Sequence, residues 1–464
     1  MSRKLIVMLL SLQVLLLYLL PVVNANETAN IEITDVVKGK KEYTYLMMER
    51  ELKALEKAYP ELVELHSIGK SEYERELYAL AIGKGSATVF INASHHAREY
   101  FTTAIVMNQI QDLLIRQAKE AEVSDLLEHV TIWVVPMVNP DGVSLVQKGP
   151  EAFPKEIQQT LLQMNKGNTN FNSWKANAKG IDLNRQYPAN WNNIKNNAGK
   201  ASAMNYKGSK PLETKENQAL IKLTYEINPQ IAISNHSTGR IIYWNFHTPE
   251  LHYKRDARLA SELSKLTGYS LVKPSANPSG GGYTDWFIQT FGKPAFTPEM
   301  APYNNGEPVA TKYFEDEWRR HRNVMVWAAE SAYELWIEEQ QQQFTSVDRV
   351  ITLTKPMKLY KQPDRSSYAY TTLKQENIKV KAQWDHWFLV DTWAGERYIY
   401  LPDEARLIEE QTISLDEETA FYRYPYEGAP KIGTLSSQHI KVIKQTLNWA
   451  KVNTWLGDMW IQLK

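Results

Sequence analysis

The chain has 464 residues and no cysteine, and its 53 basic and 53 acidic residues give a formal net charge of zero. This length predicts two or three domains, because a single hydrophobic core rarely grows so large. The balanced charge gives no support for a nucleic-acid partner or for electrostatic attachment to a membrane. Without cysteine, disulfides and thiolate ligands are excluded, so any metal must be held by His, Asp or Glu.

The first residues have the pattern of an export signal. Arg3 and Lys4 precede the apolar stretch "LIVMLLSLQVLLLYLLPVV", and "VNA", which ends at Ala25, is a small-residue cleavage site. We therefore predict a signal peptide at 1–25, a secreted chain, and no membrane attachment after cleavage. Because the apolar stretch is long, an uncleaved anchor is the alternative.

The segment 26–343 alternates short β-rich runs with longer helical patterns. This alternation is typical of an α/β domain with a largely parallel sheet flanked by helices. The second predicted strand is expected to end in the turn "NPDG". The expected helices are 43–62, 100–120 and 313–343, and the expected strands are 87–93, 130–138 and 230–235.

The region after residue 345 is rich in β patterns and tryptophan, and it contains an internal repeat. "LYKQP" at 359 recurs as "FYRYP" at 421, and "IKVKAQWDHWFLVDTWAGERYIYL" at 378 recurs as "IKVIKQTLNWAKVNTWLGDMWIQL" at 440. Both copies are 62 residues apart. Two such units predict two small β-barrels in tandem, at 346–408 and 409–464.

Two tryptophans in each unit stand at matching positions. Trp387 and Trp393 correspond to Trp449 and Trp455. The pattern W-x-x-V-x-T-W-x-G resembles bacterial SH3-like domains, and this resemblance implies binding to cell-wall peptidoglycan. The alternative is that all four tryptophans belong only to the barrel cores.

The stretch "ASHHAREY" at 93–100 is the first candidate for a functional site. His96 and Glu99 form an H-x-x-E pattern directly after a predicted strand, where open α/β sheets place their sites. Imidazole and carboxylate are ligands that zinc accepts. His247 and Glu250 repeat the same spacing without a clear strand before them. The spacing alone therefore does not identify a metal site.

Further motifs follow in chain order. "SNHSTG" places His236 at another strand end, "GIDLNRQYP" contains D-x-N-R, "SGGGYTDWF" is a glycine-rich loop, and "AFTPEM" contains Glu299. Together with H-x-x-E, they resemble the zinc metallocarboxypeptidase (carboxypeptidase A-like) family from about residue 43 to about residue 333. The resemblance implies a mixed, largely parallel sheet and a zinc peptidase.

The resemblance also assigns the metal ligands. It implies one Zn²⁺ per catalytic domain, bound by His96, Glu99 and His236, with a fourth position open for water. His95 is interpreted as a neighbour of the site and not as a ligand. Glu299 matches the family's general base. Lys175 falls where the family usually has an arginine that stabilises the oxyanion, and lysine offers a point charge in place of a planar fork.

Matched positions supply the expected substrate contacts. Asn184 and Arg185 correspond to residues that bind a substrate carboxylate, and Arg98 to a secondary substrate-binding arginine. Tyr283 lies near the family's mobile tyrosine, although the extra glycine in "SGGGY" shifts the alignment. Thr284 stands where the family sets side-chain preference. Threonine there argues against a pocket tuned for aromatic or for basic residues alone.

The segment "WKANAKGIDLNRQYPANW" resembles a bacterial branch of the family, the γ-D-glutamyl-diamino acid peptidases, and the lysine in place of arginine belongs to that resemblance. It implies hydrolysis of the γ-D-glutamyl-diamino acid bond in peptidoglycan stem peptides. One alternative is a broad secreted metallocarboxypeptidase that acts on protein-derived peptides. A second alternative is a non-catalytic cell-wall-binding protein, against which the complete ligand set and Glu299 speak.

Overall fold

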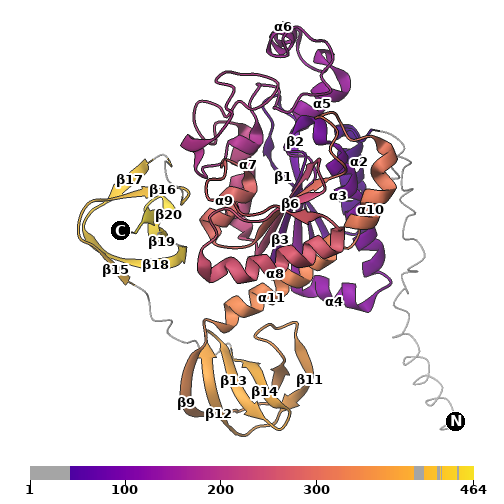
Figure 1. Cartoon of the computed structure of the whole chain (residues 1–464). Helices are drawn as coiled ribbons and strands as arrows, with labels where there is room; N and C mark the ends of the chain where they lie inside the picture. The colour runs from indigo at the N-terminus through magenta and orange to yellow at the C-terminus, as the bar shows by residue number, and fades with distance from the viewer. Residues whose placement is uncertain (1–41, 402–411, 426–428, 430, 447–448, 464) are drawn as a thin grey trace, which may run out of the picture. The chain divides into compact units, whose positions relative to one another are not determined.

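The structure is a computed structural model that describes residues 42–401, 412–425, 429, 431–446 and 449–463 (Figure 1). The predicted signal peptide at 1–25 lies outside the described residues, and so does the expected boundary at 408–409. Within the described part, no helix has both the length and the apolar character that crossing a bilayer requires.

An eight-stranded sheet forms the centre of the first domain, in the order β1-β2-β4-β3-β5-β8-β6-β7. The four central strands, β4, β3, β5 and β8, run parallel to one another. This arrangement confirms the predicted fold class. The strands are β1 (Val63–Lys70), β2 (Glu76–Gly83), β3 (Ala87–Ala93), β4 (Val130–Val135), β5 (Ile231–Ser237), β6 (Ile241–Tyr243), β7 (Ser270–Leu271) and β8 (Ala295–Met300).

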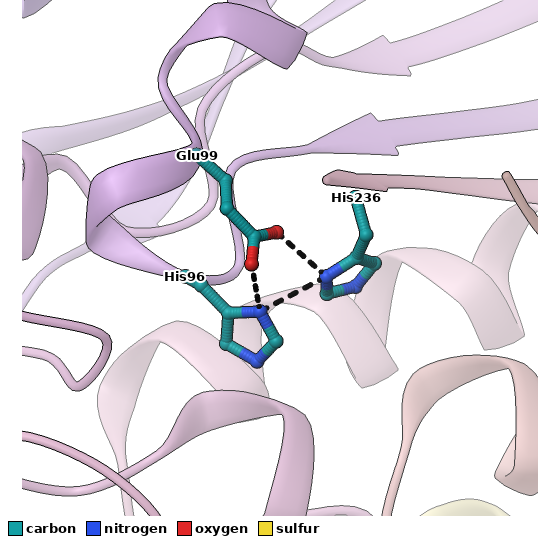
Figure 2. Close-up of side chains that lie close together, drawn as sticks. All are labelled: His96, Glu99 and His236. Carbon is teal, nitrogen blue, oxygen red and sulfur yellow. Dashed lines mark hydrogen bonds and ion pairs between the residues drawn. The ribbon is translucent and has the colours of Figure 1, made fainter. Parts of the chain in front are cut away.

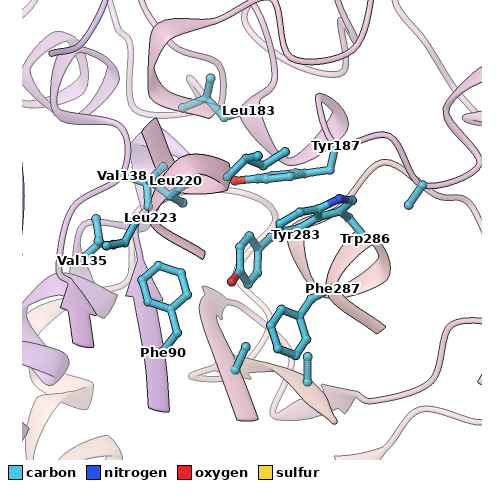
Figure 3. Packing of buried hydrophobic residues seen from close by; sticks show 14 of the residues in the cluster. Phe90, Val135, Val138, Leu183, Tyr187, Leu220, Leu223, Tyr283, Trp286 and Phe287 are labelled. Atoms are coloured by element: carbon cyan, nitrogen blue, oxygen red, sulfur yellow. The ribbon is translucent and has the colours of Figure 1, made fainter. Parts of the chain in front are cut away.

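Helices pack against this sheet and close its core (Figure 1). Figure 3 shows Phe90 of β3 packed with Leu220 of α7 and with Tyr283 and Trp286 of α9. The expected helices at 43–62 and 100–120 correspond to α2 and α3. The helices are α2 (Tyr45–Ala58), α3 (Phe101–Gln117), α4 (Ala121–His129), α5 (Pro140–Lys148), α6 (Lys155–Met164), α7 (Lys215–Ile227), α8 (Glu250–Thr267), α9 (Tyr283–Phe291), α10 (Phe314–His321) and α11 (Val324–Gln341).

The single long helix predicted at 313–343 is two helices. The helical conformation is interrupted between α10 and α11, at Arg322 and Asn323. The backbone carbonyl of His321 accepts a hydrogen bond from the side-chain amide of Gln109 at 2.6 Å. A carbonyl at a helix end needs such a partner, and Gln109 comes from α3, so a contact remote in sequence satisfies the break.

Glu216 is a fully buried carboxyl group in the first turn of α7. Burial, and then the neighbouring Asp141, raise the pKa of Glu216 to about 8 from 4.5. The folded chain therefore keeps a proton that the unfolded chain releases, so the free energy of unfolding falls as pH rises from about 4.5 to about 8.

We expect the Glu216→Gln variant to be more stable than the wild type at pH 8. That advantage is expected to shrink by more than about 2 kcal/mol at pH 5, since one pKa unit corresponds to about 1.4 kcal/mol. Urea unfolding at the two pH values measures it. The exposed Glu226→Gln on the same helix is the control. An advantage that is equal at both pH values would contradict the assignment.

The C-terminal region forms two six-stranded antiparallel sheets with the same topology. Their orders are β11-β10-β14-β13-β12-β9 and β15-β18-β19-β20-β16-β17, and reading the second backwards reproduces the first. The first sheet has β9 (Thr345–Thr352), β10 (Met357–Tyr360), β11 (Tyr368–Leu373), β12 (Asn377–Trp384), β13 (Trp387–Thr392) and β14 (Gly395–Tyr400). The second has β15 (Thr412–Leu415), β16 (Thr419–Tyr422), β17 (Lys431–Leu435), β18 (Gln438–Thr446), β19 (Trp449–Thr454) and β20 (Gly457–Gln462).

The repeat in the sequence is thus a repeat of structure. Strands β13 and β14 reappear as β19 and β20, each displaced by 62 residues. Trp387 and Trp449 are each 6% exposed. They meet Tyr360 and Tyr422 edge-on, with ring centroids 5.2 and 5.4 Å apart. For this pair of tryptophans, the structure gives a core role in each sheet.

Candidate functional site: a metal centre at the strand ends

The loop after β3 folds back on itself and brings the H-x-x-E pair together. Ser94 has a positive φ of 55°, and its hydroxyl shares a hydrogen bond with the Thr103 hydroxyl at 2.7 Å. The following 3₁₀ turn, Ala97–Glu99, returns Glu99 to the side of His96. The three-residue spacing therefore places imidazole and carboxylate next to each other.

The "NPDG" motif, which follows the neighbouring strand β4, fixes the position of this loop through hydrogen bonds. It opens helix α5 and is not the isolated turn that the sequence suggested. The Asn139 side chain accepts a hydrogen bond from the amide of Gly142 at 2.9 Å, as an N-cap does. Its Nδ2 donates to the carbonyls of His95 and Ala176, both at 3.1 Å. One asparagine therefore ties the histidine loop to the segment that carries Lys175.

His236 reaches the site from β5. It lies within the strand and not directly after it, as the next-to-last residue. The parallel register places His236 opposite Glu299 on β8. The amide of Ser237 donates to Glu99 Oε2 at 3.2 Å. Adjacent strands of the sheet therefore fix the positions of His236 and Glu299.

Three side chains converge at this point (Figure 2). Nδ1 of His96 lies 2.8 Å from Oε1 of Glu99, and Nδ1 of His236 lies 2.9 Å from Oε2 of the same carboxylate. The two Nδ1 atoms are 3.0 Å apart. Among the described residues, this is the group of three that fits a metal ion. His247 and Glu250 are not part of it.

The protonation states suit metal binding. Burial lowers the pKa of His236 although Glu99 opposes it, so the imidazole is neutral, as a metal ligand must be. Burial alone would raise the pKa of Glu99, but His96 and His236 hold it below its ordinary value. Two imidazoles and one carboxylate are the ligand set of a catalytic zinc site.

His95 is a neighbour of the triad, as the sequence suggested. Its Nε2 shares a hydrogen bond with the Tyr187 hydroxyl at 2.8 Å. The pKa of His95 lies well below its ordinary value, mainly because the ring is buried. Its ring stacks on that of His236, with centroids 5.6 Å apart. His95 therefore supports a ligand from behind.

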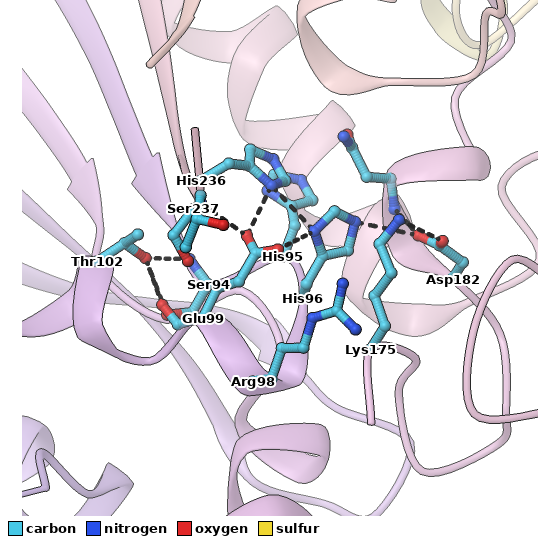
Figure 4. A network of polar contacts seen from close by, with 12 residues as sticks. Ser94, His95, His96, Arg98, Glu99, Thr102, Lys175, Asp182, His236 and Ser237 are labelled. Carbon is cyan, nitrogen blue, oxygen red and sulfur yellow. Dashed lines mark hydrogen bonds and ion pairs between the residues drawn. The ribbon is translucent and has the colours of Figure 1, made fainter. Parts of the chain in front are cut away.

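Asp182 is a residue of the site that sequence reasoning missed (Figure 4). Its Oδ1 lies 3.3 Å from Nε2 of His96, and its Oδ2 lies 3.1 Å from Nζ of Lys175 and 3.3 Å from Nε of Arg185. Burial raises the pKa of Asp182, but Lys175 and then His96 outweigh it and hold the pKa well below its ordinary value. A carboxylate behind a ligating imidazole orients the ring.

A cleft of about 520 Å³ opens beside the triad. Asp285 also lies on its wall, and burial raises the pKa of Asp285 to about 7 although the Gly282 amide donates to it. The cleft is large enough for a short peptide. Six of the predicted site residues line it: His96, Lys175, Asn184, Arg185, Thr284 and Glu299.

The predicted carboxylate-binding pair occupies one wall. Arg185 donates to the carbonyl of Lys195 at 2.6 Å and to Asn205 Oδ1 at 3.2 Å, in addition to its contact with Asp182. These bonds use three of the five N–H groups of a guanidinium, so two stay available for a ligand. Asn184 Oδ1 accepts from the Tyr283 amide at 3.0 Å.

The structure contradicts the expected substrate contact of Tyr283. Its side chain is 0% exposed, and its hydroxyl shares a hydrogen bond with Thr224 at 3.0 Å. The ring belongs to the hydrophobic core, because the first turn of α9 directs it there (Figure 3). The tyrosine that lines the cleft is Tyr243 of β6, 46% exposed. Thr284 does face the cleft, and its hydroxyl pairs with that of Thr297 at 2.6 Å.

Glu299 lies on the cleft wall next to the triad. Burial and then Glu99 raise the pKa of Glu299 well above its ordinary value, and Lys175 and Arg98 act against this shift. Both cations are thus close enough to influence the carboxyl group. Arg98 is absent from the described lining of the cleft, and its Nη1 donates to the carbonyl of Ser173 at 3.1 Å.

The sequence model of the family described as zinc carboxypeptidase matches residues 48–324. The chain belongs to the zinc carboxypeptidase family. This zinc metallopeptidase assignment accords with a convergent triad of two imidazoles and one carboxylate, His96, Glu99 and His236, which fits a zinc ion.

The curated relatives of this zinc carboxypeptidase include bacterial proteins. A protein named γ-D-glutamyl-L-diamino acid endopeptidase 1, from Lysinibacillus sphaericus, is 36% identical over 282 residues, which cover 59% of this chain and 69% of that protein. The uncharacterized protein YqgT of Bacillus subtilis (strain 168) is 30% identical over 280 residues, which cover 59% of this chain and 73% of that protein.

Solved structures resemble the catalytic domain in fold. Bovine thrombin-activatable fibrinolysis inhibitor, in complex with tick carboxypeptidase inhibitor, superposes with a TM-score of 0.52 at 19% identity, covering 64% of this chain and 99% of that one. A crystal structure of thrombin-activatable fibrinolysis inhibitor gives a TM-score of 0.53 at 18% identity, covering 66% and 78%. At these identities the likeness concerns the fold.

Asp182 gives a test of how the zinc ligands are oriented. We expect Asp182→Asn to lower zinc affinity about 10- to 100-fold, because the amide no longer fixes the His96 ring by charge. Competition with a chromophoric chelator measures the dissociation constant. Asp285→Asn makes the same change at a carboxyl group on the cleft wall that has no recorded contact with His96, and it serves as the matched control. Equal zinc affinity in both variants and the wild type would refute this role for Asp182.

Proposed function

We propose that this chain is a secreted zinc peptidase that hydrolyses the γ-D-glutamyl-diamino acid bond of peptidoglycan stem peptides. Zinc bound at His96, Glu99 and His236 would polarise the scissile carbonyl and acidify the attacking water. The name of the Lysinibacillus sphaericus relative supports the substrate. The observation that carries the proposal is the charge of the cleft around the triad.

That cleft is predominantly cationic, although the whole chain is neutral. A γ-linked stem peptide keeps the α-carboxylate of its D-glutamate free, and the diamino acid adds at least one further carboxylate. In an ordinary α-linked peptide, the C-terminal carboxylate is the one carboxylate that is always present. Several fixed cations therefore suit the stem peptide better. The charged lining residues are the cations Lys175, Arg185, Lys195 and Lys273 and the carboxyl groups Asp285 and Glu299.

In the proposed reaction, Glu299 accepts the proton of the attacking water and passes it to the leaving amine nitrogen. Its raised pKa suits a group that must both take up and release a proton. Lys175 places its ammonium, held by Asp182 at 3.1 Å, next to the developing oxyanion. The lysine replaces two directed hydrogen bonds with one charge, and Asp182 limits its freedom.

The substrate would be oriented by the opposite wall. Asn184 and the two available N–H groups of Arg185 bind the α-carboxylate of the diamino acid, as a guanidinium can do with two parallel hydrogen bonds. Arg98, which matches a secondary substrate-binding arginine of the family, would attract the free carboxylate of D-glutamate. Thr284 offers a small polar surface to the side chain of the diamino acid.

The C-terminal units would deliver the enzyme to its substrate. We assign peptidoglycan binding to these two SH3-like sheets, on the basis of their sequence pattern and their repeated topology. A tethered binding unit raises the local concentration of substrate without a new contact in the active site. The export signal predicted at 1–25 would carry the chain to the cell wall.

The proposal is tested with two peptides that differ only in their linkage. The full chain, loaded with zinc, is incubated with L-Ala-γ-D-Glu-diaminopimelate and with its α-linked isomer, and free diaminopimelate is measured by mass spectrometry. We expect release from the γ-linked peptide at a rate at least about tenfold higher.

Each other outcome has a defined meaning. Equal or faster release from the α-linked isomer would contradict the proposal in favour of a broad carboxypeptidase. No release from either peptide, with zinc bound, would contradict it in favour of a non-catalytic wall-binding protein.

A further inference from the structure

Each C-terminal sheet carries one tryptophan that is largely exposed to solvent. Trp393 is 75% exposed and Trp455 is 69% exposed, whereas Trp387 and Trp449 are 6% exposed. Both exposed tryptophans stand in the turn of an equivalent hairpin, β13–β14 in one sheet and β19–β20 in the other. At these two matched positions, the repeat has therefore kept one buried and one exposed indole in each unit.

The turn that presents the indole is the same in both units. The Thr392 hydroxyl donates to the carbonyl of Gly395 at 2.7 Å and accepts from the following Ala394 amide at 3.1 Å. In the second unit, the Thr454 hydroxyl donates to the carbonyl of Gly457 at 2.7 Å and accepts from the Leu456 amide at 3.2 Å. Threonine and glycine fix each turn, so the fold does not require tryptophan between them.

A single exposed apolar side chain needs no explanation. An indole exposed at the same turn of both units, where the turn does not require it, favours a ligand surface. The residue after the tryptophan differs, since it is Ala394 in one unit and Leu456 in the other. A wide apolar patch is therefore not common to the two turns. What they share is an exposed indole ring, which favours a ligand that stacks over one that inserts an apolar side chain.

The strands behind both turns add polar groups. Asp391 pairs across the strands with Glu396, and Lys381 contacts both carboxylates. At the equivalent place in the second unit, Asn453 donates to Asp458 at 3.1 Å. An aromatic face with hydrogen-bonding groups on the flanking strands matches a pyranose ring, which presents C–H groups on its face and hydroxyl or acetamido groups at its edge.

We propose that Trp393 and Trp455 are two equivalent sites that bind a glycan strand by stacking on its sugar rings. The ligand class is a polysaccharide of β-linked N-acetylated hexoses, such as the glycan of the cell wall. Two copies of one site suit a polymer whose units repeat, because two weak contacts on one chain add in affinity. The inference rests on the wall targeting in the proposed function and not on the peptidase chemistry.

The test is co-sedimentation of the full chain with three insoluble probes: intact peptidoglycan, peptidoglycan stripped of its stem peptides, and chitin. The variants are Trp393→Ala, the double Trp393→Ala/Trp455→Ala, and the double Trp→Tyr, which keeps a stacking ring. Trp455 also meets Phe421 edge-on at 5.3 Å, so the single Trp393→Ala is the cleaner variant. Val350→Ala, at a residue 65% exposed in the first unit, is the matched control.

We expect the wild type, the Val350→Ala variant and the double Trp→Tyr variant to bind all three probes. The single Trp393→Ala variant should bind at least about tenfold more weakly, and the double alanine variant about 100-fold more weakly, because avidity is lost. Hydrolysis of a soluble stem peptide should be unchanged in every variant.

Three results would overturn the proposal. They are undiminished binding by the double alanine variant, no binding of the wild type to any probe, and binding to intact but not to stripped peptidoglycan, which would indicate a peptide ligand. Failure of stem-peptide hydrolysis with glycan binding intact would count against the proposed peptidase function alone.

Discussion

The Glu299→Gln variant is expected to bind zinc normally and to lose catalysis. We expect kcat/KM to fall about a thousandfold, which is within the range for removal of a general acid–base group. Glutamine has nearly the same shape as glutamate but cannot take up a proton. Because Glu299 faces His236 across β5 and β8, its position does not depend on its charge.

Two measurements separate this loss from a structural effect. Zinc content and affinity for the γ-linked peptide should stay close to those of the wild type, so the decrease should appear in kcat and not in KM. The Thr297→Ser variant, on the same strand, keeps the hydroxyl that pairs with Thr284 and is the control for disturbance of β8. Retention of more than about a tenth of wild-type kcat would exclude Glu299 as the general base.

The His236→Ala variant is expected to lose both zinc and activity. The imidazole Nδ1 lies 3.0 Å from Nδ1 of His96 and 2.9 Å from Oε2 of Glu99, and without it the site has only two ligands. Removal also weakens the hold on Glu99, whose pKa His96 and His236 together lower. We expect zinc in the purified chain to fall from one per chain to none and hydrolysis to fall to background.

The chain provides its own control for this variant. His247 and Glu250 repeat the H-x-x-E spacing outside the triad, so His247→Ala removes a histidine of the same local pattern. It should retain zinc and activity. If His247→Ala lost zinc while His236→Ala kept it, the metal would lie at the other pair.

The resemblance to the zinc carboxypeptidases assigned the metal ligands, and two of them, His96 and His236, stand near the ends of apolar runs. The runs at 87–93 and 230–235 are recognisable from composition alone, and parallel strands bring their carboxyl ends to one edge of the sheet. The H-x-x-E spacing needed only a single turn to join His96 and Glu99. The sequence could not give the register that sets His236 opposite Glu299, because strand pairing depends on the whole sheet.

The roles of tyrosine and aspartate were harder to predict. Tyr283 points into the core from α9, whereas Tyr243 points away from the core on β6. Sequence spacing near a glycine-rich loop does not reveal this difference. In β6, the buried Ile242 precedes the exposed Tyr243. Successive side chains of a strand point to opposite faces, so Tyr243 points away from the core that Ile242 enters. Asp182 was visible as the first residue of D-x-N-R. Its contact with His96 joins two segments that are remote in sequence, so the sequence did not reveal it.

The internal repeat predicted two β units but not the roles of their tryptophans. Equal spacing made Trp387 and Trp393 look alike in the sequence. In the structure, Trp387 begins strand β13 and packs on Tyr360, whereas Trp393 stands in the turn after that strand. The exposure of a side chain in a turn depends on turn geometry, which periodicity does not report.

The most direct test of the metal centre is diffraction from crystals of the zinc-loaded chain on either side of the zinc absorption edge. The predicted result is one anomalous peak within bonding distance of Nδ1 of His96, Nδ1 of His236 and the carboxylate of Glu99. The contradictory result is the absence of a peak at this position, or a peak at His247 and Glu250 in its place.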